Sequence, residues 1–193
     1  MKIIGITGKS GSGKSTLANL LAKELNCAGI DVDKIGHKAT NDENISRKLC
    51  GIFGKEILGR EGIIDRKKLG NIVFSDQEKM DILTDVTWDY MQEKIDEILK
   101  NKPEIIILEW ALLPISKYWE KSDMKILIQA NQDERKKKVI ERDEITEEYF
   151  EKRDSKSLDY ETVNADFKFY NEYEKKQMKD FINQIISKLF WVS

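Results

Sequence analysis

Five short apolar segments of the chain have the pattern of buried β-strands. Ile3–Thr7 is rich in β-branched residues, and Ile105–Leu108 is apolar throughout, with no alternation of polar side chains. Continuous apolar strands of this kind are typical of a sheet that is covered on both faces. The expected strands are Ile3–Thr7, a segment that ends near Gly29–Asp31, Glu104–Glu109, Met124–Gln129 and a weaker one at Phe167–Tyr170.

Helical patterns separate these strands. Lys14–Leu25 carries leucines at helical spacing, and a long helix with isoleucines along one face follows the last strand. Strands that alternate with helices predict a parallel sheet with right-handed crossovers. We therefore expect the α/β class, with a five-stranded parallel sheet and helices on both of its faces.

Between the second and third strands lies a charged, largely helical stretch, about residues 41–100. It predicts a helical insertion beside the carboxyl edge of the sheet, within one domain that spans residues 1–193. The composition is consistent with one domain, because 40% of the 193 residues are hydrophobic and 35% are charged, which allows one substantial core.

Charge and cysteine usage narrow the class of protein. The formal net charge of -2 argues against a nucleic-acid binder, because a phosphate backbone is bound by clustered basic side chains. Cys27 and Cys50 are the only cysteines, and two buried, reduced thiols fit them better than a disulfide. Neither an export signal nor a run of ~20 apolar residues is seen. We expect a soluble, cytoplasmic monomer with no membrane or nucleic-acid partner.

The strongest chemical signal is Gly8–Ser15, which matches the phosphate-loop pattern G-x-x-x-x-G-K-[ST]. It follows a buried strand and opens a helix, so backbone N–H groups and the helix amino end can surround phosphate oxygens. Nucleotide binding is predicted for Gly8, Gly11, Ser12, Gly13, Lys14, Ser15 and Thr16.

Within this loop, Lys14 would reach the β- and γ-phosphates of ATP, and Ser15 would coordinate Mg²⁺ directly or through water. Thr16 could approach the α-phosphate. The Asn-Lys-x-Asp segment of switch GTPases does not occur, and the third strand ends in Glu109–Trp110 rather than in the paired acids of hydrolytic ATPases. A kinase that uses ATP and Mg²⁺ on a small molecule fits best.

Two carboxylates follow the second strand, at the sheet edge where open α/β folds bind ligands. Asp31 and Asp33 are two residues apart, so both side chains face the same side if the chain is extended. One can accept the proton of an acceptor hydroxyl while the other orients the sugar or Mg²⁺-bound water, and we assign the base to Asp33. The alternative is that Asp33 only caps the next helix.

The charged stretch at about residues 134–157 is a candidate lid. Its Arg142 and Arg153 can bind the transferring phosphoryl group if the stretch folds over the nucleotide. The alternative is a solvated helix with paired charges, which we favour for Lys136–Lys138 but not for Arg142.

Two further side chains are candidates for binding the acceptor. His37 is the only histidine of the chain, and Arg66 can meet an acidic group of the substrate. The alternatives are a half-buried histidine with no ligand and an ordinary helix start in which Asp65 is the cap.

Together these motifs resemble those of dephospho-CoA kinases. That family pairs Gly-x-x-Gly-Ser-Gly-Lys-Ser with Asp-x-Asp-x-x-x-His, and Gly8–Ser15 and Asp31–His37 match both patterns. Further similar segments follow in the family's order: Phe53–Gly54, Gly62–Arg66, Leu69 with Val73–Phe74, Glu109 with Leu112–Leu113, Arg135, Arg142–Asp143, Arg153, and Ala165–Phe167 with Asn171.

The resemblance implies phosphoryl transfer from ATP to the ribose 3′-hydroxyl of dephospho-CoA, with the helical insertion as the acceptor-binding part. It also implies that Asn171 lies on the adenine side of ATP and binds the nucleotide. Trp88–Asp89 stands where the family usually has His-Pro, which leaves room for another nucleoside or nucleotide as the acceptor. A nucleotide-binding regulatory module without turnover is the other alternative.

Overall fold

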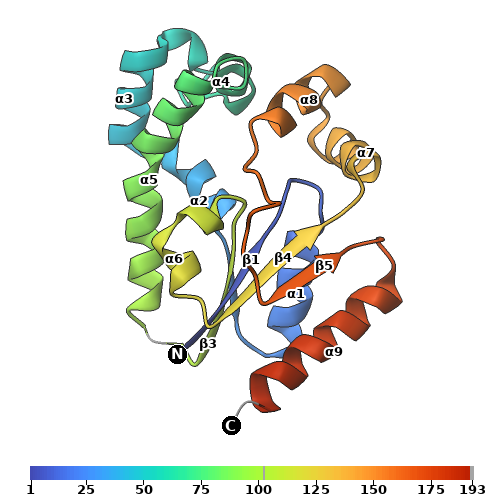
Figure 1. The fold of residues 1–193 in the computed structure, drawn as a ribbon. Coiled ribbons are helices and arrows are strands. Elements are labelled where there is room, and N and C mark those ends of the chain that lie inside the picture. The colour runs from blue at the N-terminus through green and yellow to red at the C-terminus, as the bar shows by residue number, and fades with distance from the viewer. Residues whose placement is uncertain (102, 192–193) are drawn as a thin grey trace. The chain divides into compact units, whose positions relative to one another are not determined.

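The computed structural model describes residues 1–101 and 103–191. Its strands form one sheet in the order β2-β3-β1-β4-β5, and all neighbouring pairs are parallel (Figure 1). They are β1 Lys2–Thr7, β2 Ala28–Asp31, β3 Ile105–Glu109, β4 Met124–Gln129 and β5 Phe167–Tyr170. The predicted α/β class and five-stranded parallel sheet are thus confirmed.

The helices fill the connections between the strands. They are α1 Lys14–Glu24, α2 Val32–Ala39, α3 Glu43–Phe53, α4 Arg66–Val73, α5 Gln77–Leu99, α6 Lys117–Glu120, α7 Gln132–Asp143, α8 Glu147–Ser155 and α9 Lys175–Trp191. Several begin at an acidic cap, because a carboxylate accepts hydrogen bonds from N–H groups of the first turn. Asp42 caps α3, Asp65 caps α4 and Asp76 caps α5 in this way.

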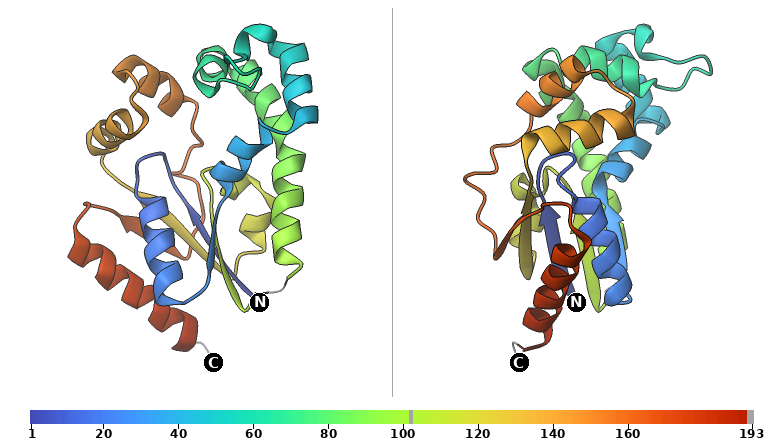
Figure 2. Two further views of the ribbon diagram at one scale, coloured as in Figure 1. Left: turned by 180° about the vertical axis from the view of Figure 1, so that it is seen from behind. Right: turned by 90° about the vertical axis from the view of Figure 1, so that its right-hand side faces the viewer.

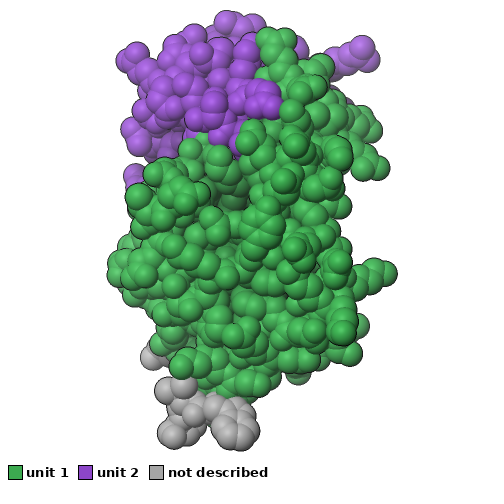
Figure 3. Space-filling view, turned by 45° about the vertical axis from the view of Figure 1, so that its right-hand side comes forward, with its two compact units in different colours: residues 1–31, 102–150, 157–193 green, residues 32–101, 151–156 purple. Residues whose placement is uncertain are grey.

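The chain divides into two compact units, which Figure 3 colours separately. The first contains residues 1–31, 102–150 and 157–193 and includes the whole sheet. The second contains residues 32–101 and 151–156. The second unit takes in the range of about 41–100 that we predicted as a helical insertion, and it also includes α2.

One face of the sheet carries the main core. α1 and α9 lie on this face (Figure 2) and bury Leu17, Leu21 and Ile185 against the strands. On the opposite face, Gly5 of β1 leaves space for Ser122, since a Cβ atom at Gly5 would approach the Ser122 hydroxyl to 2.7 Å. The segment around α6 therefore covers the second face, as a parallel sheet requires.

The second unit has its own apolar core. Leu49 and Phe53 of α3, Leu69 of α4 and Val73 of α4 are buried together with Ile57. The helical unit thus buries apolar side chains without relying on the sheet for its core.

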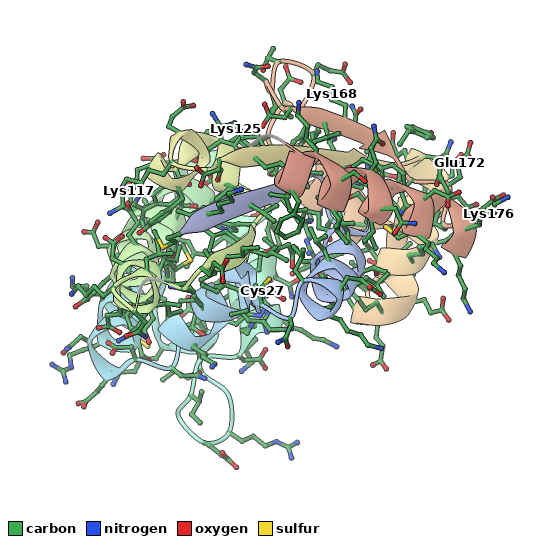
Figure 4. The ribbon with its side chains drawn as sticks, turned by 90° about the horizontal axis from the view of Figure 1, so that it is seen from below. Cys27, Lys117, Lys125, Lys168, Glu172 and Lys176 are labelled. Atoms are coloured by element: carbon green, nitrogen blue, oxygen red, sulfur yellow. The ribbon has the colours of Figure 1, made fainter. Side chains whose placement is uncertain are left out.

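The structure can be compared with the expectations of two reduced thiols and of no membrane-spanning helix. Cys27, which precedes β2 (Figure 4), and Cys50 are both free, as predicted, but each is half-buried rather than buried. Burial raises the pKa of the Cys27 thiol. Among the helices within residues 1–101 and 103–191, none is long and apolar enough to cross a membrane.

A core substitution in β3 should measure how much the sheet contributes to stability. Ile107 is fully buried in the core cluster that includes α1, so Ile107→Ala is expected to lower the free energy of unfolding by about 3 kcal/mol, through lost burial and an unfilled cavity. Ile105 points to the same face of β3 but is only partly buried, and Ile105→Ala is the matched control with a smaller loss. Urea denaturation measures both, and equal losses would contradict this burial difference.

Candidate active site

The phosphate loop joins β1 to α1, and its backbone depends on glycine. Gly11 and Gly13 have φ values of 81° and 101°, in the left-handed region that favours glycine. Gly13 is the N-cap of α1 and has no side chain to bond the first helical N–H groups. Those groups therefore stay available to a bound anion, and the positive end of the helix dipole favours one there.

Two buried polar side chains of the loop are suited to phosphate oxygens. Lys14 is 7% exposed; its Nζ donates to the Lys9 carbonyl at 3.2 Å and lies 4.0 Å from Glu109 Oε1. The Ser12 hydroxyl is buried and has no hydrogen-bond partner within the described chain. A phosphate oxygen would give Ser12 the acceptor that the protein does not supply.

Glu109 also lies at the candidate site, although the sequence analysis named it only as the end of the third strand and as part of a family-like segment. It is 3% exposed at the carboxyl end of β3, where it pairs in register with Asp31 of β2 and Ile6 of β1. An acidic residue at the end of an apolar strand could have indicated a site residue in the sequence. The register of the sheet brings the carboxylates of Glu109 and Asp31 to the same edge, because parallel strands all end there.

The oxygen donors at this edge fit Mg²⁺. Ser15 is exposed in the first turn of α1, and Asp31 and Glu109 end neighbouring strands. Within the described residues, no group of three or more His, Cys, Asp or Glu side chains is placed to hold a metal by itself. A kinase-bound Mg²⁺ takes most of its ligands from phosphates and water, so it would need few oxygen atoms from the protein.

The expected relation between Asp31 and Asp33 is wrong in one respect. β2 ends at Asp31 and α2 begins at Val32, so Asp33 lies in the first helical turn and not in extended chain. The argument that alternation places both side chains on one side therefore does not hold. Nor does Asp33 occupy the cap position, because the helix starts one residue before it. Both carboxylates are half-buried.

His37 and Arg66 contact each other within the helical unit. Arg66 Nη2 is hydrogen-bonded to His37 Nε2. A guanidinium group can only donate, so His37 Nε2 is the acceptor of this hydrogen bond. Asp65 accepts hydrogen bonds from two N–H groups of α4, as an ordinary cap does. The structure thus pairs the two predicted acceptor-binding residues, and both are exposed.

In the candidate lid, Arg142 forms two hydrogen bonds to the Asp143 carboxylate, at 2.6 and 2.9 Å, and lies 3.4 Å from the Ser10 hydroxyl of the phosphate loop. Lys137 forms an ion pair with Glu134 at helical spacing, as expected for a solvated helix, whereas Lys136 forms an ion pair with Glu147 of α8. Arg142 thus lies beside the phosphate loop as an exposed side chain that is paired with Asp143.

Asn171 lies directly after β5 and is 2% exposed. Its Nδ2 donates to the Ser12 carbonyl at 2.8 Å, and its Oδ1 accepts from the Tyr173 N–H at 2.9 Å. Both polar atoms of the side chain are thus bonded to backbone. A direct role in binding the nucleotide stays a prediction for this residue.

A phosphate loop between the first strand and the first helix, with carboxylates at the ends of the adjoining strands, defines a P-loop kinase fold. Similarity to a shikimate kinase from Bacteroides thetaiotaomicron supports the fold alone, with a TM-score of 0.56 and 13% identity over 99% of each chain. The family model for dephospho-CoA kinase matches residues 2–177. The chain belongs to the dephospho-CoA kinase family.

Individual relatives agree with this family. The chain is 38% identical to a dephospho-CoA kinase of Aquifex aeolicus over 164 residues, which is 83% of each chain. It is 29% identical to the dephospho-CoA kinase of Listeria innocua, covering 96% of this chain and 98% of the relative. The solved dephospho-CoA kinase of Campylobacter jejuni has a TM-score of 0.61 and 29% identity, over 97% of this chain and 96% of its own.

Proposed function

We propose that this protein transfers the γ-phosphoryl group of ATP to the ribose 3′-hydroxyl of dephospho-CoA. The observation that carries the proposal is the phosphate loop with buried Lys14 in a chain whose family match spans residues 2–177. The acceptor oxygen forms a bond to the γ-phosphorus while the bond to the β-phosphate oxygen breaks, and ADP leaves.

The residues of the loop and the strand ends have separate roles in this proposal. The loop N–H groups and Lys14 bind the phosphates and compensate the negative charge that moves toward the β-phosphate as the bond breaks. The Ser12 hydroxyl, which has no partner in the described chain, donates to a phosphate oxygen. Mg²⁺, when bound, supplies further positive charge, and Ser15, with Asp31 or Glu109 through water, would hold it.

Asp33 is the proposed base. It accepts the proton of the 3′-hydroxyl as the oxygen attacks, and Asp31 orients the sugar or a water on the metal. His37 and Arg66 are proposed to bind acidic groups of the acceptor, because a guanidinium group offers two N–H donors to a phosphate. Arg142 acts from the proposed lid of about residues 134–157 on the transferring group.

We also infer a cytoplasmic location and a monomer. Free thiols such as Cys27 and Cys50 persist in a reducing compartment. All residues assigned to the reaction lie on one chain, so a second copy is not required for chemistry.

A panel of acceptors tests the proposed reaction. With Mg-ATP, dephospho-CoA is expected to give a kcat/KM at least about 100-fold higher than adenosine, AMP or shikimate, because binding energy from the rest of the substrate positions its hydroxyl. ADP release is the readout, with mass spectrometry of each product. A higher kcat/KM for one of the other nucleosides or nucleotides would overturn the acceptor, and ADP release without any acceptor would point to a nucleotide hydrolase.

A further inference from the structure

The carbonyl groups of the phosphate loop need donors of their own. A loop that binds phosphate through its N–H groups turns carbonyl oxygens outward, and buried carbonyls are almost always hydrogen-bonded. The Lys9 carbonyl accepts from the Ser12 N–H at 3.2 Å, and the Gly13 carbonyl accepts from the Leu17 N–H at 3.0 Å. The three carbonyls between these two receive hydrogen bonds from side chains.

Those three side chains come from distant parts of the chain. They are Arg135 Nη1, which donates to the Ser10 carbonyl at 3.1 Å, the Tyr173 hydroxyl, which donates to the Gly11 carbonyl at 2.9 Å, and Asn171 Nδ2, which donates to the Ser12 carbonyl at 2.8 Å. Arg135 belongs to α7, and the other two belong to the turn between β5 and α9. The outer side of the loop is thus held at three consecutive peptide groups.

Tyr173 occupies its place at a conformational cost. Its φ is 63°, in the left-handed region that an aromatic residue rarely adopts. The Asn171 Oδ1 bond to its N–H fixes this turn, which also carries the exposed Glu172 and leads into α9, where Lys176 is exposed (Figure 4). Strain of this kind persists where the surrounding structure holds it in place and often marks a functional site.

The Tyr173 side chain is itself fixed in position. The ring is half-buried, and Lys138 Nζ of α7 lies 4.3 Å from its centroid, within the range of a cation–π contact. Burial raises the pKa of the Tyr173 phenol, so the hydroxyl stays protonated and able to donate at neutral pH. The hydroxyl that reaches Gly11 is therefore a pre-positioned donor.

From Gly11 a chain of contacts leads to Lys14. The Gly11 carbonyl and the Ser12 N–H belong to one planar peptide group and point in opposite directions. The Ser12 N–H donates to the Lys9 carbonyl, and that same carbonyl accepts from Lys14 Nζ at 3.2 Å. Tyr173 thereby holds the carbonyl end of the Gly11–Ser12 peptide group. The N–H end of the same group bonds to the Lys9 carbonyl, which is also bonded to Lys14.

We propose that Tyr173 is a positioning residue of the phosphate loop, whose hydroxyl fixes the Gly11–Ser12 peptide group and so keeps the loop in the shape that binds the phosphates of ATP. It touches no substrate and acts through the loop backbone and Lys14. This inference rests on the proposed function, because it needs the loop to bind ATP. None of the motifs in the sequence analysis includes Tyr173.

The Tyr173→Phe variant removes the hydroxyl and keeps the ring. We expect its Kd for Mg-ATP, measured by calorimetry, to rise about fivefold, which is the effect of one net hydrogen bond. The KM for dephospho-CoA should stay unchanged, and the midpoint of thermal unfolding without nucleotide should fall by no more than about 4 °C, because only one hydrogen bond of the loop is lost. Tyr173→Gly, which suits the positive φ but lacks the whole side chain, should weaken Mg-ATP binding at least as much.

Matched control variants distinguish a positioning role of Tyr173 from a nonspecific effect of substitutions near the loop. Tyr170→Phe removes an exposed phenol three residues away on β5, and Asn26→Gly relaxes another positive φ, of 48°, after α1. Both should bind Mg-ATP as the unmodified chain does. A Kd within twofold of the parent value in Tyr173→Phe or Tyr173→Gly overturns the inference, as does a rise in Kd that is matched by an equal rise in the KM for dephospho-CoA. Failure of the unmodified chain to bind Mg-ATP would instead refute the proposed function.

Discussion

Replacing Lys14 by methionine is expected to lower kcat for phosphoryl transfer by about 1,000-fold. Lys14 is the buried cation of the phosphate loop, and its Nζ is hydrogen-bonded to the Lys9 carbonyl. A positive charge that is fixed where negative charge develops contributes most to the transition state in a site that excludes water. Methionine has a similar length but no charge. Steady-state kinetics with saturating Mg-ATP and dephospho-CoA measures the loss.

Folding and catalysis have to be separated for this variant. Lys14 Nζ lies 4.0 Å from the buried Glu109 carboxylate, so Lys14→Met removes one of the cations near a buried anion and should also lower stability. The double variant Lys14→Met with Glu109→Gln should regain stability and remain inactive. Lys23→Met, at an exposed position in the last turn of α1, is the control with normal activity. Activity of Lys14→Met within tenfold of the parent would contradict the role given to this lysine.

Replacing Asp33 by asparagine should have the second largest effect. Asparagine has nearly the same shape but cannot accept a proton, and the loss of a general base costs about 100- to 10,000-fold in kcat. The unmodified enzyme should lose activity at low pH, where the base is protonated, because a protonated carboxyl group cannot accept the hydroxyl proton. In Asp33→Asn the residual activity should not show this decrease at low pH, the acid limb of the pH profile.

Asp31→Asn distinguishes the two carboxylates. Asp31 is proposed to orient the sugar or metal-bound water, so its variant should lose less activity and keep the acid limb of the pH profile. Asp85→Asn, at an exposed position of α5, should leave both activity and profile unchanged. A larger loss and a vanished acid limb in Asp31→Asn would transfer the role of base to Asp31.

The sheet could be predicted from the sequence because its strands are nearly continuous apolar runs. Ile105–Leu108 and Met124–Gln129 have few polar positions, and that pattern is typical of a strand covered on both faces. The phosphate loop was equally predictable, since its glycines and Lys14 are adjacent in sequence. Local patterns of this kind do not depend on which distant segments meet.

Some features of the site could not be predicted from the sequence, because they depend on local backbone geometry or on contacts between distant segments. The sequence gives no sign that α2 starts directly at Val32, a buried residue, and this start puts Asp33 in a helical turn. Glu109 becomes part of the site through the register of β3 with β1 and β2. Tyr173 contacts Gly11 across 162 residues of chain, and no short motif encodes such a contact.

The transfer of phosphate to a defined hydroxyl is the most direct test of the assigned chemistry. The unmodified protein would be incubated with Mg-ATP and dephospho-CoA, and the product would be mapped by ³¹P NMR and mass spectrometry. One ADP should appear for each molecule of product, with the new phosphate on the ribose 3′-oxygen. ADP formed without a phosphorylated product, or a phosphate at any other position, would contradict the account.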